Sequence, residues 1–248
     1  MKREELMQYI LGFVLITFII GSIIGQHIPQ DVSYHNFADN CTHYSIPNFW
    51  NVTSNIPFII CGLLFFLSTK NKNYFFNLIR KFMGIGFITT GIGSGFYHWS
   101  PNNYTLVWDR IPMTIVFVSF FHLLIHQKVS ENIAKNSLMP SLLLGILSVV
   151  YWIYTEHTGI GDLRFYIIIQ FYPLVATFII LAFSWKTIKG RFWIFSAFIF
   201  YISAKFFETQ LDEFLFNTLH FSGHTVKHLF AAAAGISLYY WVKKITND

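Results

Sequence analysis

Eight long apolar segments alternate with short polar connections along this chain. A helix needs about 20 apolar residues to cross the hydrocarbon core of a bilayer. The segments that meet this length approximately are 9–25, 49–68, 81–98, 108–126, 137–155, 165–185, 192–210 and 223–242. One longer polar stretch, 26–48, separates the first two, and we find no low-complexity tract or convincing internal repeat. The pattern predicts an all-α integral membrane protein with a single membrane domain over residues 1–248.

The composition supports a membrane protein and argues against several other classes. Of the 248 residues, 54% are hydrophobic and 12% are charged, whereas soluble domains carry about 25% charged residues. The net charge of +5 is small and the basic residues lie mostly in short loops, so we expect no nucleic-acid partner. Cys41 lies in a loop and Cys61 within an apolar segment, which excludes a disulfide scaffold.

The first apolar segment has two possible interpretations. It follows the charged start MKREE, as the apolar part of a cleaved signal peptide does. However, the residues that follow, GQHIPQD, contain no small-residue cleavage site, and the segment is nearly long enough to span a bilayer. We therefore predict that residues 9–25 form a retained transmembrane helix.

The positions of lysine and arginine predict the orientation, because cytoplasmic loops carry an excess of both. With the N-terminus inside, four of the seventeen basic residues lie on the outer side or within helices, namely Arg110, Arg164, Lys205 and Lys227. The other thirteen lie in inner segments or at their helix edges: Lys2, Arg3, Lys70, Lys72, Arg80, Lys81, Lys128, Lys135, Lys186, Lys189, Arg191, Lys243 and Lys244. Eight spans then place both termini inside.

Three histidines have the positions expected of metal ligands. His224 and His228 are four residues apart, so both rings lie on one face of a helix and can reach one ion. His98 ends the third predicted span on the same outer side and could supply a third nitrogen. Three protein ligands leave a tetrahedral position open for water, which is typical of a catalytic zinc site. The alternative is that these are interface histidines, hydrogen-bonded to neighbours or water.

Two further residues near His98 could take part in the chemistry. Asp109 follows His98 by eleven residues across a short turn, and a carboxylate beside zinc and water can accept a proton and pass it to a leaving amine. Ser94 lies one turn before His98 and could hydrogen-bond the water or a tetrahedral intermediate. Alternatively, Ser94 is a small residue that eases helix packing, and Asp109 pairs with Arg110 or caps a helix.

Other polar residues are better explained by structural roles. His220 extends the row of His224 and His228, but Ser222 and Gly223 should break the helix between them. We interpret His122 and His126, another pair four residues apart, as interface histidines at the inner end of the fourth span.

An acidic and basic cluster closes the seventh predicted span. Lys205, Glu208 and Asp212 share one helix face and predict an ion-paired strip. Asp212 could also accept a hydrogen bond from a histidine N–H of the metal site.

The chain resembles the alkaline ceramidase family of the CREST group of membrane hydrolases. The resemblance rests on a Ser-x-x-x-His pair (Ser94 and His98), an aspartate eleven residues later (Asp109) and a late His-x-x-x-His pair (His224 and His228). The stretch NFWNVTSNIPF is similar to the start of the family's first core helix. Residues 49–242 then correspond to the seven-helix core, 26–48 to an outer loop, and 9–25 to an extra N-terminal helix that points to a bacterial-type member.

The resemblance implies a zinc-dependent hydrolase of linear amide bonds. His98, His224 and His228 would bind Zn²⁺, Asp109 would activate water, and Ser94 would assist at the oxyanion. The substrate would be ceramide or a similar N-acyl lipid from the bilayer, cleaved to a fatty acid and a long-chain amino alcohol. We expect no obligate protein partner, and a bacterial cytoplasmic membrane as the location, with the active site near its outer face.

One departure concerns calcium. Animal members of the family carry an acidic calcium site before the first core helix, and calcium prefers several oxygen ligands that include carboxylates. Here Asn48 precedes that helix and DNCTHY holds one acid, Asp39, so calcium activation is not expected, although Asp39, Asn40 and Asn48 could still form a weak site.

Two alternative functions stay open, because the same five residues suit them. An ester-cleaving CREST-type hydrolase would use the same zinc and water against a glycerolipid. A non-catalytic receptor of the progestin-receptor-like type would keep the metal for structure and show no turnover.

Overall fold

The computed structural model describes residues 3–68 and 71–246, and these are mostly helical. Within those two ranges no strand forms, and the β-structure is an isolated bridge between His43 and Ile46. The α-helices are α1 (Arg3–Ile24), α2 (Phe49–Thr53), α3 (Ile56–Leu67), α4 (Tyr74–Trp99), α5 (Asn103–Lys128), α6 (Glu131–His157), α7 (Arg164–Ser184), α8 (Arg191–Gln210), α9 (Asp212–Leu219) and α10 (Gly223–Thr246). Two short 3-10 helices are η1 (Val32–His35) and η2 (Trp185–Thr187). The predicted all-α class is confirmed.

The protein is a multi-pass membrane protein. In the described ranges, six helical segments are long and apolar enough to span a bilayer: α1, α2 with α3, α5, α6, α7 with η2, and α8. Helices α4 and α10 have 26 and 24 residues but are not among these six segments. The predicted count of eight spans is therefore approximate. The orientation stays a prediction, and two residues that it used, Lys2 and Lys70, lie outside the described ranges.

The structure differs from the predicted spans at two places, and each has a local cause. The span predicted at 49–68 divides into α2 and α3, because Pro57 in the first turn of α3 has no N–H to continue the helix. The short helix α9 was not predicted as a separate element. It ends at His220, which has a left-handed φ of 59°, so the expected break before Gly223 is present.

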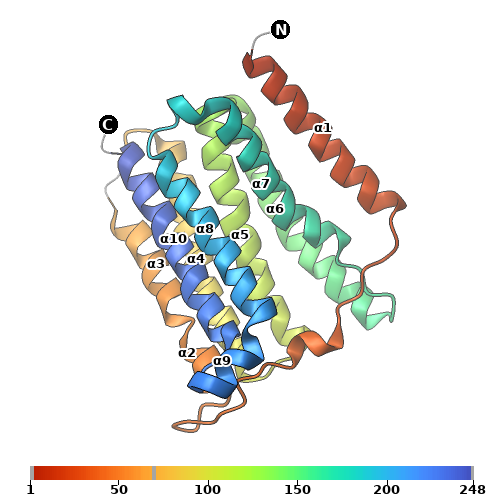
Figure 1. Ribbon diagram of the computed structural model, residues 1–248. Helices are drawn as coiled ribbons and strands as arrows, with labels where there is room; N and C mark the ends of the chain where they lie inside the picture. The colour runs from red at the N-terminus through yellow and green to blue at the C-terminus, as the bar shows by residue number, and fades with distance from the viewer. Residues whose placement is uncertain (1–2, 69–70, 247–248) are drawn as a thin grey trace. The chain divides into compact units, whose positions relative to one another are not determined.

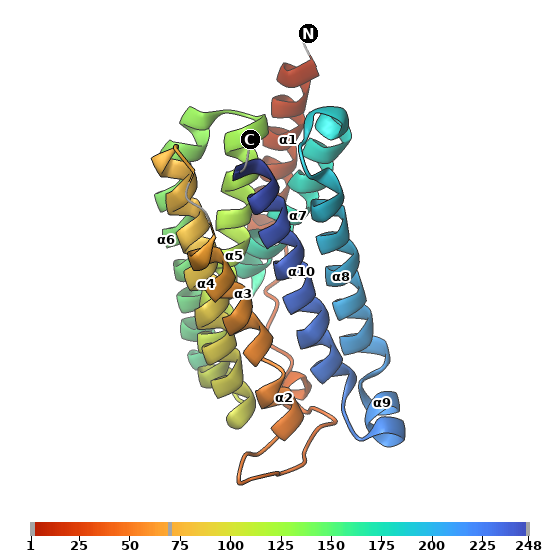
Figure 2. The same cartoon turned by 90° about the vertical axis from the view of Figure 1, so that its left-hand side faces the viewer.

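The chain divides into two compact units. Unit 1 consists of Met1–Gln30, Asn73–Met83 and Thr114–Ile188, and unit 2 of Asp31–Lys72, Gly84–Met113 and Lys189–Asp248. Within unit 1, α7 lies against both α1 and α6 (Figure 1). Within unit 2, α10 packs between α3 and α8, with α9 at the end where α8 and α10 connect (Figure 2). The single-domain description of the chain stays a prediction.

Candidate metal centre

His98, His224 and His228 form one buried cluster in unit 2. His98 lies in the last turn of α4, and the other two occupy the first two turns of α10. Their exposed fractions are 0%, 3% and 2%. The ring centroids of His98 lie 4.8 Å from those of both His224 and His228, which are 4.9 Å apart. One ring nitrogen from each lies within 4.8 Å of the others, so the three can hold one metal ion.

The hydrogen bonding of the cluster fits a metal site. Among the described residues, neither ring nitrogen of His98 has a hydrogen-bond partner, and neither does Nε2 of His228. Buried polar atoms without partners are unfavourable unless an ion or a water satisfies them. A set of three neutral imidazoles is compatible with zinc. These unpartnered nitrogens therefore favour a metal site over three interface histidines.

Ser54 fixes the orientation and tautomer of His228. The Ser54 hydroxyl donates to the backbone oxygen of Asn51 at 3.1 Å, and its oxygen lies 2.8 Å from Nδ1 of His228. With the serine hydrogen donated to Asn51, Nδ1 of His228 is the donor to the Ser54 oxygen. The lone pair of His228 is then on Nε2, the nitrogen left available to the cluster.

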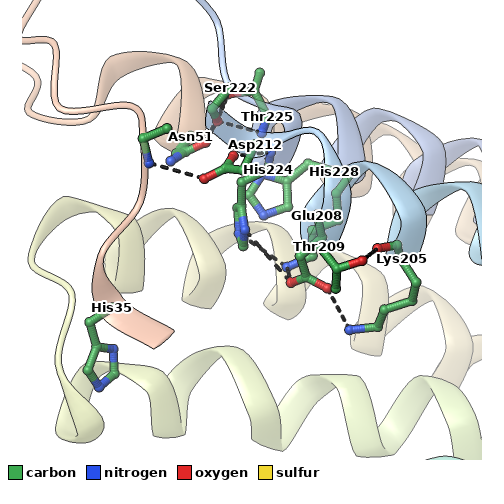
Figure 3. A network of polar contacts seen from close by, with 12 residues as sticks. His35, Asn51, Lys205, Glu208, Thr209, Asp212, Ser222, His224, Thr225 and His228 are labelled. Carbon is green, nitrogen blue, oxygen red and sulfur yellow. Dashed lines mark hydrogen bonds and ion pairs between the residues drawn. The ribbon is translucent and has the colours of Figure 1, made fainter. Parts of the chain in front are cut away.

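His224 contacts a charged network made of Lys205, Glu208 and Lys227. Figure 3 shows Lys205, Glu208 and His224. Nδ1 of His224 lies 3.7 Å from Glu208 Oε1, and Nε2 lies 3.2 Å from Lys227 Nζ. Lys227 also lies 2.9 Å from Glu208, so it keeps a partner if a metal ion takes Nε2. The predicted Lys205–Glu208 ion pair is present at 2.7 Å.

Asp212 acts differently from the prediction. Its Oδ1 accepts the backbone N–H of His224 at 2.7 Å, and its Oδ2 accepts the N–H of Ala38 at 3.1 Å. The ring of His224 instead faces Glu208. Asp212 therefore holds the start of α10 and the preceding loop together, and Glu208 is the carboxylate that faces the ring.

Ser94 and Asp109 lie together where α4 and α5 approach each other. Both are buried, with exposed fractions of 2% and 7%, and the Ser94 side chain lies beside the Asp109 carboxyl. Asp109 is within range of the charge of Lys227, which precedes the candidate ligand His228 on α10. Because α5 begins at Asn103, Asp109 lies inside the helix and does not cap it.

Gly93 permits this pairing. A Cβ at Gly93 would lie 1.9 Å from the backbone oxygen of Trp108, which no side-chain movement could relieve. The two helices can therefore approach closely only where residue 93 has no side chain, next to Ser94 and Asp109. The packing role that the sequence analysis considered for Ser94 is therefore one that Gly93 fills.

We predict that Gly93→Ala lowers any turnover by about 100-fold, since a misplacement of about 1 Å in a reacting group can cost that much. Gly95→Ala is the matched control, because its Cβ would meet only the Val52 oxygen, at 3.8 Å. Steady-state kinetics of the two purified variants provide the measurement. Equal activity of both would show that the close approach of α4 and α5 does not matter.

The sequence did not reveal the network that holds α2 against α10. Asn51 is fully buried, and its Oδ1 accepts from Ser222 at 3.0 Å and Thr225 at 2.8 Å (Figure 3). Asp39 accepts the Asn51 N–H at 2.8 Å and the Cys41 N–H at 3.3 Å. The sequence does contain a hint of these contacts in the stretch NFWNVTSN. Asn51 and Ser54 are one turn apart there, so both polar side chains lie on the same side of the chain.

Phe37, which was also not anticipated, covers the cluster. Its ring centroid lies 4.7 Å from that of His98 and 4.3 Å from that of His224. The hydrogen bond from the next residue, Ala38, to Asp212 holds this part of the loop in place. An aromatic ring here shields the histidines from bulk water.

The other histidines lie outside the cluster. His220 ends α9 and is not on α10. His122 has its own partners, with Nδ1 2.8 Å from the Val118 oxygen and Nε2 3.0 Å from the Ser137 hydroxyl. His126 lies 3.8 Å from Glu131 and does not join a metal-binding group in the described ranges.

The model of the family described as Ceramidase matches residues 33–246. No curated protein and no solved structure gives a significant match. The match covers most of the chain, including the five candidate site residues, and the chain belongs to the ceramidase family.

Proposed function

We propose that this ceramidase-family protein is a zinc-dependent lipid amide hydrolase that cleaves ceramide or a similar N-acyl lipid. The observation that carries the proposal is the buried cluster of His98, His224 and His228 in the same compact unit as the Ser94–Asp109 pair. Family membership supports hydrolysis of a lipid amide bond. The unpartnered nitrogens of His98 and His228 support the metal requirement.

The residues divide the chemistry between them. Zinc held by the three histidines supplies Lewis acidity and lowers the pKa of water to about 7. Asp109 accepts the proton that water loses as its oxygen bonds to the amide carbonyl carbon. Ser94 donates a hydrogen bond to the oxygen that becomes negative. Asp109 then passes the proton to the nitrogen as the C–N bond breaks, which leaves a fatty acid and a free amine.

The surroundings suit a lipid substrate. Phe37 limits access of bulk water to the histidines, which strengthens the electrostatic interactions of the site. A multi-pass membrane protein can take its substrate directly from the bilayer. From the distribution of lysine and arginine we further propose that both termini are cytoplasmic and that the site lies near the outer face of a bacterial cytoplasmic membrane.

The substrate class is tested with two lipids that carry the same fluorescent acyl chain. One is a ceramide, and the other is a diacylglycerol with an ester in place of the amide. We expect the purified protein to release fatty acid from the ceramide with the higher kcat/KM. Release from the ester alone would contradict the amidase proposal and favour the ester-cleaving alternative. Zinc binding without release from either lipid would favour a receptor.

A further inference from the structure

Unit 1 contains a cavity with a volume of about 620 Å³. Its walls come from α1, α5, α6 and α7, and none of its lining residues belongs to the candidate metal centre. Pockets that bind small molecules typically measure about 300–1,000 Å³. The cavity is therefore large enough for a ligand, and nothing in the proposed hydrolysis uses it.

The cavity arises because α1 packs on α7 along only part of its surface. Met7 and Leu11 are buried, and the Leu11 backbone oxygen accepts from the Tyr172 hydroxyl at 3.4 Å. One to two turns further along, Leu15 and Ile19 line the cavity. Helix α1 therefore forms one wall of the cavity without filling it.

Both ends of α1 are fixed to α7, which keeps the cavity preformed. Near the start, the Arg3 guanidinium donates to the Ala182 oxygen at 3.2 Å. Beyond the other end, Arg164 donates to the Gly25 oxygen and pairs with Asp162 at 2.8 Å. Burial alone would raise the pKa of Asp162, but hydrogen bonds from Arg164 and Tyr151 outweigh it and lower that pKa, so the pair stays charged.

Small serines on α6 provide the space in the opposite wall. Ser137, Ser141 and Ser148 follow one stripe of the helix and line the cavity. The hydroxyl of Ser137 donates to the Ile133 oxygen at 2.6 Å, and that of Ser148 donates to the Gly145 oxygen at 2.7 Å. Because their own helix satisfies these two hydroxyls, Ser137 and Ser148 add volume without requiring a polar ligand.

The lining selects a hydrocarbon. It contains no Asp, Glu, Lys or Arg, and both ring nitrogens of His122 are already hydrogen-bonded within the protein. The cavity is partly open, and apolar surface that is left uncovered there forfeits dispersion contacts. The helices around it are α1, α5, α6 and α7, all of which are long and apolar enough to span a membrane, and lipid chains are the abundant apolar molecules there.

We propose that this cavity is an accessory lipid site that binds one acyl chain of a membrane phospholipid between α1 and α6. The chain lies along the serine stripe and contacts Leu15 and Ile19 on the facing wall. The proposal does not depend on hydrolytic activity, because it rests on the membrane location and on the cavity lining.

The test is photo-crosslinking of the full-length protein, reconstituted with a phosphatidylcholine that carries a diazirine on one acyl chain. Peptide mapping of the wild type should locate adducts on the cavity walls of α1 and α6. Ser141→Phe places a bulky ring on the serine stripe and should strongly reduce these adducts. Leu143→Phe is the matched control, because Leu143 is 56% exposed on the same helix and does not line the cavity.

A second pair of variants tests the opposite wall, in case the Ser141 variant does not fold. Leu15→Trp places a larger side chain on the facing wall and should reduce the cavity adducts, whereas Ile16→Trp, at a 56% exposed position outside the lining, should keep them. The site is supported if the cavity variants fold and lose the labelling while the control variants keep it. Wild-type labelling spread evenly over the lipid-facing helices, or adducts that persist in both filled variants, would overturn it.

Discussion

Asp109→Asn is expected to lower kcat about 10²–10⁴-fold while the protein keeps its zinc. The range is the usual contribution of a positioned general acid or base. The carboxamide has nearly the same shape but cannot accept a proton from water. The proposed zinc ligands are the three clustered histidines and do not include Asp109, so the zinc content of the variant should not change. Steady-state ceramide hydrolysis and metal analysis on the same sample provide the measurement.

The matched control is Asp212→Asn, on a nearby aspartate. An asparagine there can still accept the His224 N–H through its amide oxygen and loses only the bond from Ala38. We expect a loss of turnover smaller than that in Asp109→Asn. If Asp109→Asn retains wild-type activity, Asp109 has no part in proton transfer.

His228→Ala is expected to abolish zinc binding and turnover together. Loss of a partner that only orients a metal ligand typically costs 10–100-fold in affinity or activity, and removal of the ligand itself should cost more. The purified variant should therefore contain little zinc. Metal analysis by mass spectrometry is the measurement, with thermal unfolding to verify that the helices still assemble.

His220→Ala is the control for this prediction. It extends the sequence row of His224 and His228 but lies at the end of α9, and its side chain is exposed. Its zinc content should equal that of the wild type. Full zinc occupancy in His228→Ala, or loss of zinc in His220→Ala, would mean that the ligand set is wrong.

The apolar pattern was sufficient to predict the long helices, because membrane helices satisfy their backbone hydrogen bonds locally and need a minimum apolar length. The helix boundaries depended on individual proline and glycine residues. Pro57 divides α2 from α3, and Gly223 begins α10 after a turn, and both residues were visible in the sequence. The length of α9 was not predictable, because its eight residues are too few to give a clear periodic pattern.

The candidate site was predictable where spacing along one helix determines proximity, as for His224 with His228. The meeting of His98 with them followed from counting spans. The contacts of Ser54 and Phe37 with the histidines were not predictable, because they join segments far apart in the chain. Asp212 shows why side-chain contacts are hard to predict. It lies beside His224, as expected, but accepts the backbone N–H of that residue and not a ring N–H.

Fatty-acid release from a fluorescent ceramide, by the purified wild type beside His228→Ala, tests the central claim most directly. Both proteins are assayed in detergent after verification that they elute as folded species. We predict release by the wild type, its loss on chelation and return with zinc, and none by the variant. Release by His228→Ala at the wild-type rate, or by the metal-free wild type, would contradict a zinc-dependent amidase.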